Sequence, residues 1–226
     1  MKTPVAVLIS GSGSNLQAML DKAASGVLAA DIRLVLSNRA DAYGLARAAK
    51  CGIPTAVVAH GAYPCREAFD AALVAAIRKS GAEAVVLAGF MRILGPGFVT
   101  AFAQRILNIH PALLPSFPGV HGQPDAARHG VKISGCTVHF VDEKMDHGPI
   151  VIQAAVPAHA EDDGKALGAR ILALEHRIFP QAVHWLCSGR LSIVGRHVRL
   201  APADVAPADM SGLGPCLVNP PLEQGF

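Results

Sequence analysis

Short apolar runs alternate with longer amphipathic segments through the first half of the chain. Buried strands of a parallel sheet give near-continuous apolar runs, whereas helices that cover a sheet repeat every 3.6 residues. The apolar runs predict strands at 5–10, 31–38, 55–59, 82–90 and 105–110. The amphipathic segments predict helices at 14–25, 41–50 and 66–79, with Asp41 as the N-cap of the second. Strands that alternate with helices form βαβ units, so we expect an α/β fold with an open, mostly parallel, Rossmann-like sheet and helices on both faces.

The second half of the chain follows a different pattern. Residues 110–126 are rich in proline and glycine and have no helical period, which predicts a long ordered loop. Two strands, a long helix and a small hairpin that turns at Gly195-Arg196 are predicted at 136–141, 150–156, 164–186 and 190–200. The remaining residues are rich in Pro, Gly and Asp and predict a loosely ordered tail. We therefore expect one domain over residues 1–190, followed by a C-terminal hairpin and tail over 191–226.

Composition and charge narrow the class of protein. Of the 226 residues, 51% are hydrophobic and 16% are charged, which is typical of a globular chain. The formal net charge is +3 and the basic residues are scattered, so nothing favours nucleic acid or a membrane surface as a partner. None of the five cysteines forms a Cys-x-x-Cys pair, which favours reduced thiols in the cytoplasm. We expect no signal peptide, and no apolar run reaches the length of about 18 residues that a membrane span needs.

The first strand runs into a glycine-rich loop in the sequence VLISGSGSNLQAML, residues 7–20. A dinucleotide-binding loop needs a third glycine, where this chain has Leu16, and an acidic residue about 20 positions further on. The second strand ends instead at Asn38 and Arg39, and no Gly-Lys-Ser/Thr segment of a Walker A loop is present. Both nucleotide-binding interpretations therefore fail in detail.

The loop can still bind an anion, because glycines allow close approach and the helix that follows offers free backbone N–H groups. Gly13, Ser14 and Asn15 are the candidates for holding a single phosphate. The same residues also fit a tight strand–helix turn capped by Ser14 or Asn15, and the loop by itself does not distinguish the two interpretations.

A polar cluster is expected where ligands bind in such sheets, at the carboxyl ends of the strands. Asn108 and His110 are two apart in a strand and therefore point to the same face, and Asp146 lies in a loop that precedes another strand. A carboxylate beside an imidazole favours the cationic ring, and the Asn and His N–H groups can then stabilise an oxyanion. Asp146 can accept a proton from an attacking amine, directly or through water.

Structural roles explain the same residues almost as well. A histidine at a strand end often has no catalytic part, and Asp146 can simply cap the turn at Gly148-Pro149. A metal site is a further alternative, drawing on His110, His121, His139 and His147. Their spacing matches no standard zinc pattern, so we expect no metal.

Several long segments resemble the phosphoribosylglycinamide formyltransferase family, in the same order and with similar spacing. They are VLISGSGSNLQAM, LSNRADAYGL, VVLAGFMRIL, LNIHPALLPSFPG, TVHFVDEKMDHGPIV and EHRIFP. The resemblance extends from about Val5 to Arg190, and the chain beyond about Val194 has none of it.

The resemblance implies transfer of a formyl group from 10-formyltetrahydrofolate, used as a cosubstrate, to the primary amine of glycinamide ribonucleotide. It implies no bound cofactor, two small-molecule partners, and a monomer or homodimer in the cytoplasm. The implied catalytic residues are Asn108, His110 and Asp146, and the ribonucleotide is implied to contact Gly13, Ser14, Asn15 and Glu175. The folate is implied to contact Arg66, Met91, Arg92, Ile93, Leu94, Asn108, Val141 and Asp142. On this basis residues 1–100 form a phosphate-binding half and residues 101–190 a folate and catalytic half.

Two sites in the sequence depart from the family pattern. Ser116 replaces a common lysine, and Gly122-Gln123 follows His121 in place of the usual residues, which affects the loop between the two substrates.

Three other functions compete with this interpretation. Methionyl-tRNA formyltransferase has similar segments but carries a further tRNA-binding domain, for which the roughly 35 residues after the catalytic domain are too few. Formyltetrahydrofolate hydrolase carries an extra N-terminal domain. A non-catalytic ligand-binding module on the same scaffold is the third alternative.

Overall fold

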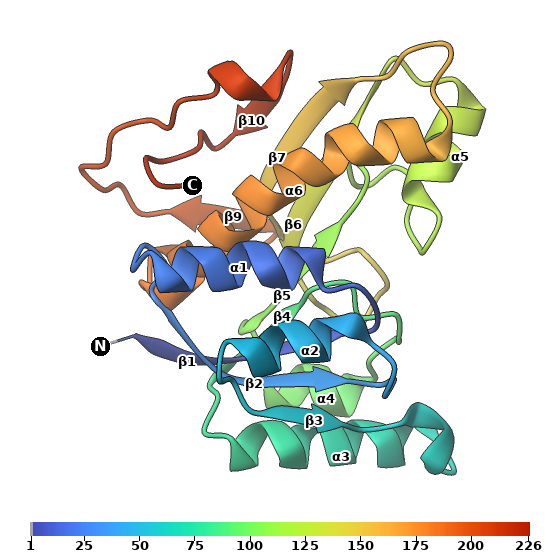
Figure 1. Ribbon diagram of the computed structural model, residues 1–226, viewed down its shortest axis with the longest axis vertical. Coiled ribbons are helices and arrows are strands. Elements are labelled where there is room, and N and C mark those ends of the chain that lie inside the picture. The colour runs from blue at the N-terminus through green and yellow to red at the C-terminus, as the bar shows by residue number, and fades with distance from the viewer. Residues whose placement is uncertain (1) are drawn as a thin grey trace.

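A computed structural model describes residues 2–226 of the chain (Figure 1). Its centre is an eight-stranded sheet in the order β10-β7-β6-β5-β4-β1-β2-β3. The strands β3, β2, β1, β4 and β5 are parallel to one another, and β6, β7 and β10 extend the sheet in antiparallel fashion. The strand bounds are Thr3–Ile9 (β1), Ala30–Ser37 (β2), Thr55–Val57 (β3), Ala84–Leu87 (β4), Ile106–His110 (β5), Ile133–Phe140 (β6), Ile150–Pro157 (β7) and Leu217–Asn219 (β10). The predicted fold class, an open and mostly parallel α/β sheet, is confirmed.

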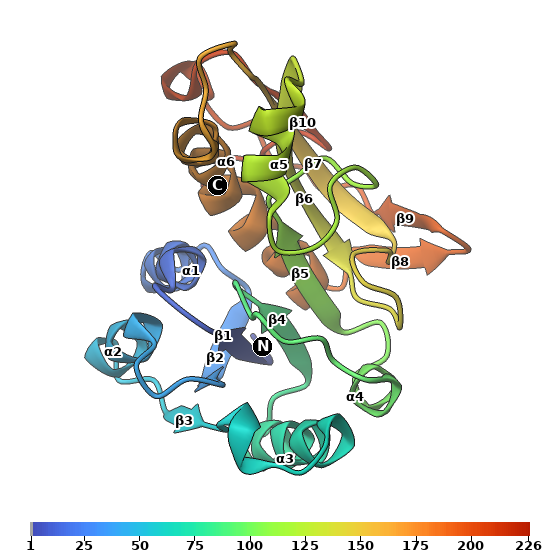
Figure 2. The same cartoon turned by 90° about the vertical axis from the view of Figure 1, so that its right-hand side faces the viewer.

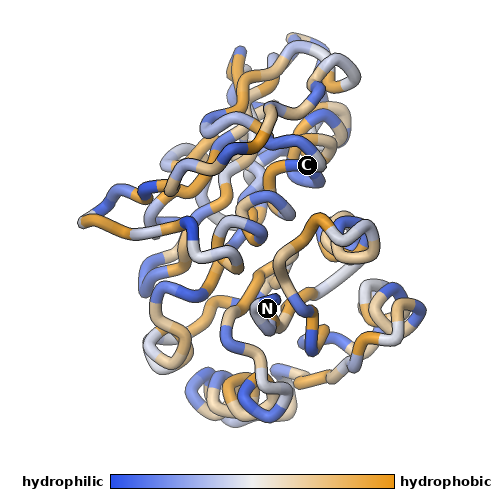
Figure 3. Tube along the Cα trace, turned by 90° about the vertical axis from the view of Figure 1, so that its left-hand side faces the viewer, coloured by the Kyte–Doolittle hydropathy of each residue, from blue (hydrophilic) through white to orange (hydrophobic). Residues whose placement is uncertain are grey.

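Helices cover both faces of the sheet, because successive side chains of a strand point to opposite faces. In β1, Val5, Val7 and Ile9 pack with one hydrophobic cluster, whereas Ala6 and Leu8 pack with the other. The first cluster is covered by α1 (Ser14–Ala24), α2 (Tyr43–Lys50) and α6 (Gly164–Cys187), and the second by α3 (Arg66–Lys79) and α4 (Pro96–Ala101). Figure 2 shows these two layers on opposite sides of β1 and β4. Along the helices, hydrophobic and hydrophilic residues alternate as one-sided burial requires (Figure 3).

Local patterns predicted most of these elements within a few residues. Helix α3 has the predicted bounds 66–79, and the hairpin of β8 (Leu191–Val194) and β9 (His197–Leu200) turns at the predicted Gly195-Arg196. The predicted N-cap Asp41 is wrong, because α2 begins at Tyr43 after Ala42 and the Asp41 carboxylate pairs with Arg39 at 2.8 Å instead. Among residues 2–226, no helix combines the length and the hydropathy that crossing a membrane requires.

The predicted loop at 110–126 is wrong in its second part, because the structure has the helix α5 at Gly122–His129. Gly122 and Ala126 of this helix are buried, and α5 packs against α6, where the Pro124 Cα lies only 3.0 Å from the position of a Cβ on Gly164. Tertiary packing stabilises α5 despite its weak helical pattern. Helix α4, with Pro96 in its first turn, was also not predicted from the pattern.

The prediction of a loosely ordered tail is also wrong. Strand β10 pairs with β7 and forms one edge of the sheet, and the side chains of Leu222 and Phe226 are buried. The Arg190 guanidinium makes two hydrogen bonds to the Glu223 carboxylate at 2.8 and 2.9 Å, and the Gln181 amide accepts the Glu223 N–H at 2.6 Å. The proline and glycine residues of 201–226 therefore mark turns of an ordered segment, called the strap below, whose apolar side chains pack against the first hydrophobic cluster.

Replacing Leu222 by Ala tests whether this strap contributes to stability. The Leu222 side chain is only 2% exposed, so its truncation should lower the free energy of unfolding by about 2–5 kcal/mol. Leu217 belongs to the same strap but is 70% exposed, and Leu217→Ala should stay within about 0.5 kcal/mol of the parent chain. Urea denaturation of the three proteins measures the difference. Equal stability of the two variants would contradict an ordered, packed strap.

Candidate active site at the carboxyl ends of the strands

The sheet topology brings the predicted polar residues to one edge. The glycine-rich loop follows β1, the segment 89–94 follows β4, and β5 ends at His110. These three strands are neighbours and parallel, so their carboxyl ends lie side by side. The loop of residues 141–149, which joins β6 to β7 and is called the β6–β7 loop below, returns to the same edge and carries Asp146.

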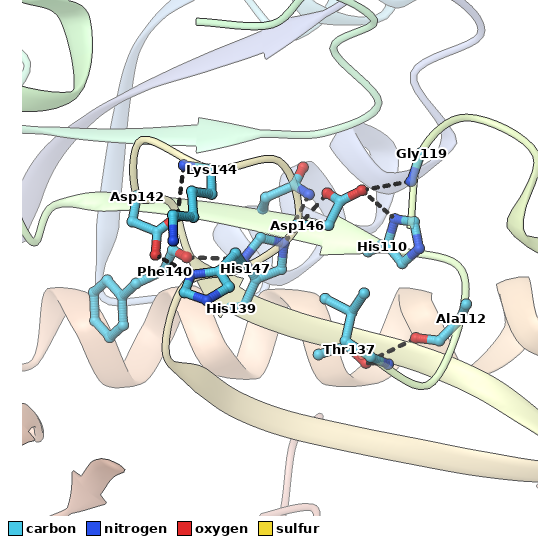
Figure 4. A network of polar contacts seen from close by, with 12 residues as sticks. His110, Ala112, Gly119, Thr137, His139, Phe140, Asp142, Lys144, Asp146 and His147 are labelled. Carbon is cyan, nitrogen blue, oxygen red and sulfur yellow. Dashed lines mark hydrogen bonds and ion pairs between the residues drawn. The ribbon is translucent and has the colours of Figure 1, made fainter. Parts of the chain in front are cut away.

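His110 and Asp146 face each other in this site (Figure 4). The His110 imidazole is buried, with Nδ1 3.5 Å from Oδ2 of Asp146 and Nε2 2.8 Å from the carbonyl oxygen of Phe117. Both ring nitrogens therefore face oxygen acceptors, an arrangement that suits a cationic imidazole.

Asp146 is held in a constrained position. Its φ angle is +50°, which non-glycine residues seldom adopt, and its side chain is 13% exposed. The carboxylate accepts the backbone N–H of Gly119 at 2.7 Å, which ties the β6–β7 loop to the segment that precedes α5. Backbone strain of this kind is found where a side chain must be aimed at a particular point.

Sequence patterns did not give His139 a place in the site, but the structure does. Asn108 of β5 pairs in register with His139 of β6, and the Asn108 amide Nδ2 lies 3.1 Å from the His139 Nε2. The His139 Nδ1 lies 2.8 Å from the carbonyl oxygen of Phe140, so Nδ1 carries the proton and Nε2 accepts from Asn108. Burial lowers the pKa of His139, which keeps the ring neutral for this role. The strand register, which the sequence does not reveal, was the missing signal.

The glycine-rich loop packs against the start of α2. Gly13 has a φ of +69°, and a Cβ there would lie 2.7 Å from the Gly44 Cα. The Gly44 N–H also donates to the Gly11 carbonyl at 3.1 Å. A cavity of about 190 Å³ opens beside the loop and is lined by residues 10–15 together with Ala88, Gly89 and Met91. The free N–H groups at the start of α1 can therefore meet an anion there.

Asn15 and Glu175 form a buried pair at the back of this loop. The Asn15 Nδ2 donates to a Glu175 carboxylate oxygen at 2.7 Å, although the two residues lie 160 positions apart. Burial raises the pKa of Glu175, and the hydrogen bond from Asn15 opposes that rise. The Asn15 Oδ1 is buried and has no hydrogen-bond partner, so it is free to accept a donor from a ligand.

The segment after β4 presents apolar side chains beside the same edge. Met91 and Ile93 are 58% and 61% exposed and Arg92 is also exposed, whereas Leu94 is buried in the second hydrophobic cluster. The Met91 N–H donates to the Ser10 hydroxyl at 2.8 Å, which joins this segment to the glycine-rich loop. Arg66, at the start of α3, lies near the C-terminal end of the segment 89–94. Its Cδ is 3.7 Å from the position that a Cβ on Gly95 would occupy.

The structure thus gathers Asn108, His110 and Asp146, with Gly13–Asn15 and Glu175 in a second group. The remaining candidates lie on segments that reach the same region: Met91, Arg92, Ile93 and Leu94 after β4, Arg66 at the start of α3, and Val141 and Asp142 at the start of the β6–β7 loop. Within residues 2–226, no three His, Cys, Asp or Glu side chains are placed to hold a metal ion together.

Comparison with known proteins gives close relatives. Residues 3–183 match the formyl transferase family. The chain is 45% identical over 189 residues to the phosphoribosylglycinamide formyltransferase of Escherichia coli (strain K12), covering 84% of this chain and 89% of the relative. It is 50% identical over 204 residues to the trifunctional purine biosynthetic protein adenosine-3 of Drosophila pseudoobscura pseudoobscura, covering 89% of this chain but only 15% of that relative.

A solved structure supports the same relationship. The crystal structure of glycinamide ribonucleotide transformylase 1 from Symbiobacterium toebii superposes with a TM-score of 0.87 at 50% identity, over 89% of this chain and 95% of that one.

Proposed function

The chain belongs to the formyl transferase family, and we infer from this membership and its relatives that it is a phosphoribosylglycinamide formyltransferase of purine biosynthesis. It transfers a formyl group from the cosubstrate 10-formyltetrahydrofolate to the primary amine of glycinamide ribonucleotide. The observation that carries this conclusion is the convergence of Asn108, His110 and Asp146 beside a loop suited to one phosphate.

We propose that the amine attacks the formyl carbon with its lone pair, which moves the carbonyl π electrons onto oxygen. The Asn108 amide and the His110 imidazolium donate N–H groups to this oxyanion. The His110 Nδ1 faces Asp146, so Nε2 is the nitrogen that donates to the oxyanion. Its N–H leaves the carbonyl oxygen of Phe117 and donates to the formyl oxygen instead. Asp146 takes the proton that the amine loses, directly or through water, and passes it to the folate nitrogen. The oxyanion then re-forms the carbonyl as the carbon–nitrogen bond to the folate breaks.

His139 acts through Asn108 in this scheme. Because the neutral His139 Nε2 accepts one Asn108 N–H, the second N–H of the same amide is left to point at the oxyanion. A donor that is already fixed in place needs no reorientation when negative charge develops on the formyl oxygen. His139 is therefore a positioning residue for Asn108.

The two substrates are proposed to bind on either side of this trio. Gly13, Ser14 and Asn15 hold the ribonucleotide phosphate at the start of α1, and Glu175 contacts the same substrate. Met91 and Ile93 offer exposed apolar contacts for the folate, with Arg66, Arg92, Leu94, Val141 and Asp142 around it. The two-part division of residues 1–190 remains a prediction on this basis.

A turnover assay tests the function directly. The protein is mixed with 10-formyltetrahydrofolate and glycinamide ribonucleotide, and loss of the folate formyl group is followed optically. Deformylation should require the ribonucleotide. Equal deformylation without it would indicate a hydrolase, and tight binding of either substrate without turnover would indicate a binding module.

Changes in the phosphate loop test which substrate it binds. Ser14→Ala and Asn15→Ala should raise the KM for glycinamide ribonucleotide by roughly tenfold, because the first removes a hydroxyl donor beside the phosphate and the second removes the amide that pairs with Glu175 behind the loop. The KM for the folate should stay within about twofold, since the loop contacts only the other substrate. Ser25→Ala, at the far end of α1, is the matched control. Parallel rises of both KM values would contradict this assignment.

We further propose a cytoplasmic enzyme that works as a monomer or a homodimer. All five cysteines are unpaired, as in proteins of reducing compartments.

A further inference from the structure

The β6–β7 loop is closed at its base but needs support along its length. At the base, a Cβ on Gly148 would lie 1.8 Å from the Phe140 carbonyl oxygen, and the Phe140 N–H donates to the Pro149 carbonyl at 2.8 Å. Between these points most residues of the loop are exposed to solvent, and Asp146 has a φ angle of +50°. Such a conformation persists only where surrounding contacts fix it.

Part of that support lies inside the loop. The Asp142 carboxylate accepts the Lys144 N–H at 3.0 Å and the His147 Nδ1–H at 2.8 Å (Figure 4). With its proton on Nδ1, the His147 ring offers Nε2 as an acceptor. Both acceptors of His147, this nitrogen and the backbone carbonyl, are then available to a donor from outside the loop.

The C-terminal hairpin supplies that donor. The side chains of Leu191, Ile193, Val198 and Leu200 pack against the first hydrophobic cluster, which anchors the hairpin to the body of the protein. At its turn, the Arg196 Nη2 donates to the His147 carbonyl at 2.6 Å, and Nη1 lies 3.5 Å from the His147 Nε2. Figure 2 shows the hairpin beside β7, next to the β6–β7 loop.

We propose that Arg196 is a positioning residue that holds the backbone next to Asp146 and so aims its carboxylate at His110. This proposal rests on the proposed function. The bond to the His147 carbonyl fixes the peptide between His147 and Gly148, one residue beyond Asp146, whereas the Gly119 N–H holds the Asp146 carboxylate itself. The positive guanidinium also lies beside a loop that carries the carboxylates of Asp142, Glu143 and Asp146, which favours its placement there. Arg196 lies beyond residues 3–183, the part that matches the family.

Kinetics of Arg196→Ala, Arg196→Lys and Arg199→Ala test the proposal. Arg196→Ala should lower kcat about 3- to 10-fold, as expected when an exposed charge-assisted hydrogen bond that helps to aim Asp146 is lost, and leave both KM values within about twofold. Arg196→Lys keeps a charged donor and should recover about half or more of the loss. Arg199 is exposed on the same hairpin, three positions from Arg196, so Arg199→Ala should match the parent enzyme.

Two results would overturn the proposal. One is an Arg196→Ala variant whose folate kinetics match those of Arg199→Ala. The other is a variant in which both KM values rise while the melting temperature falls, since that is the effect of a purely structural residue. Calorimetric binding of tetrahydrofolate provides a separate measurement. A parent protein that binds tetrahydrofolate without formyl transfer would contradict the proposed function, whereas an active parent with an unchanged kcat in Arg196→Ala would contradict the role of Arg196 alone.

Discussion

Asp146→Asn is expected to lower kcat at least about 100-fold. Asparagine keeps the size of the side chain and an oxygen that can accept the Gly119 N–H, which lies 2.7 Å from the carboxylate. It removes the negative charge that lies 3.5 Å from the His110 Nδ1 and can no longer take a proton from the attacking amine. The loss should therefore appear in kcat, with little change in either KM, and steady-state assays at saturating substrates measure it.

A control separates the lost chemistry from a general change of charge. Asp204→Asn makes the same chemical change at an exposed position in the strap, and its kcat should stay within about twofold of the parent enzyme. The melting temperatures of both variants should be close to that of the parent. Asp146→Asn with more than a tenth of the parent kcat would remove Asp146 from the proposed mechanism.

His110→Ala should cause a loss of similar size, at least about 100-fold in kcat. The change removes the donor that Nε2 offers to the oxyanion and leaves Asp146 without its imidazole partner. His159→Ala, at an exposed position away from the site, should retain the parent activity. Substrate binding should survive in His110→Ala, because neither the phosphate loop nor the exposed Met91 and Ile93 depends on the imidazole.

The losses of kcat caused by His110→Ala and Asp146→Asn should not multiply when the two substitutions are combined. His110 and Asp146 act as one unit in the proposed mechanism, so the double variant His110→Ala/Asp146→Asn should lose about as much kcat as either single variant. Single-turnover assays at several enzyme concentrations give the three rates. Fully multiplicative losses would show that the two residues act independently and would contradict the proposed pairing.

Some predictions succeeded because their physical cause is local. The helix at 66–79 follows from the spacing of Phe69, Leu73 and Ile77, which are all buried on one face. The apolar runs gave the central strands because a strand buried on both faces needs no polar residues. The hairpin turn at Gly195 follows from a glycine that adopts a φ of +61°.

Other predictions failed where packing outweighed the local pattern. Helix α5 forms because Ala126 is buried and the helix rests on α6 near Gly164, not because of a strong helical period. The proline and glycine of the strap predict a loosely ordered tail, yet the side chains of Leu222 and Phe226 are buried. Neither contact could be inferred without knowing which surface lies opposite.

By itself, the sequence determined the α/β class, most of the elements and the identity of the polar residues at the strand ends. Those features depend on residues within one turn of a helix or one strand, and such spacing is visible in the chain. The tertiary structure decided which of these residues meet: Asn15 with Glu175 across 160 positions, and Arg196 with His147 across 49. Contacts of this kind depend on the order and register of strands in the sheet. Strand order and register are set by packing of the whole chain, so they leave no local pattern to read.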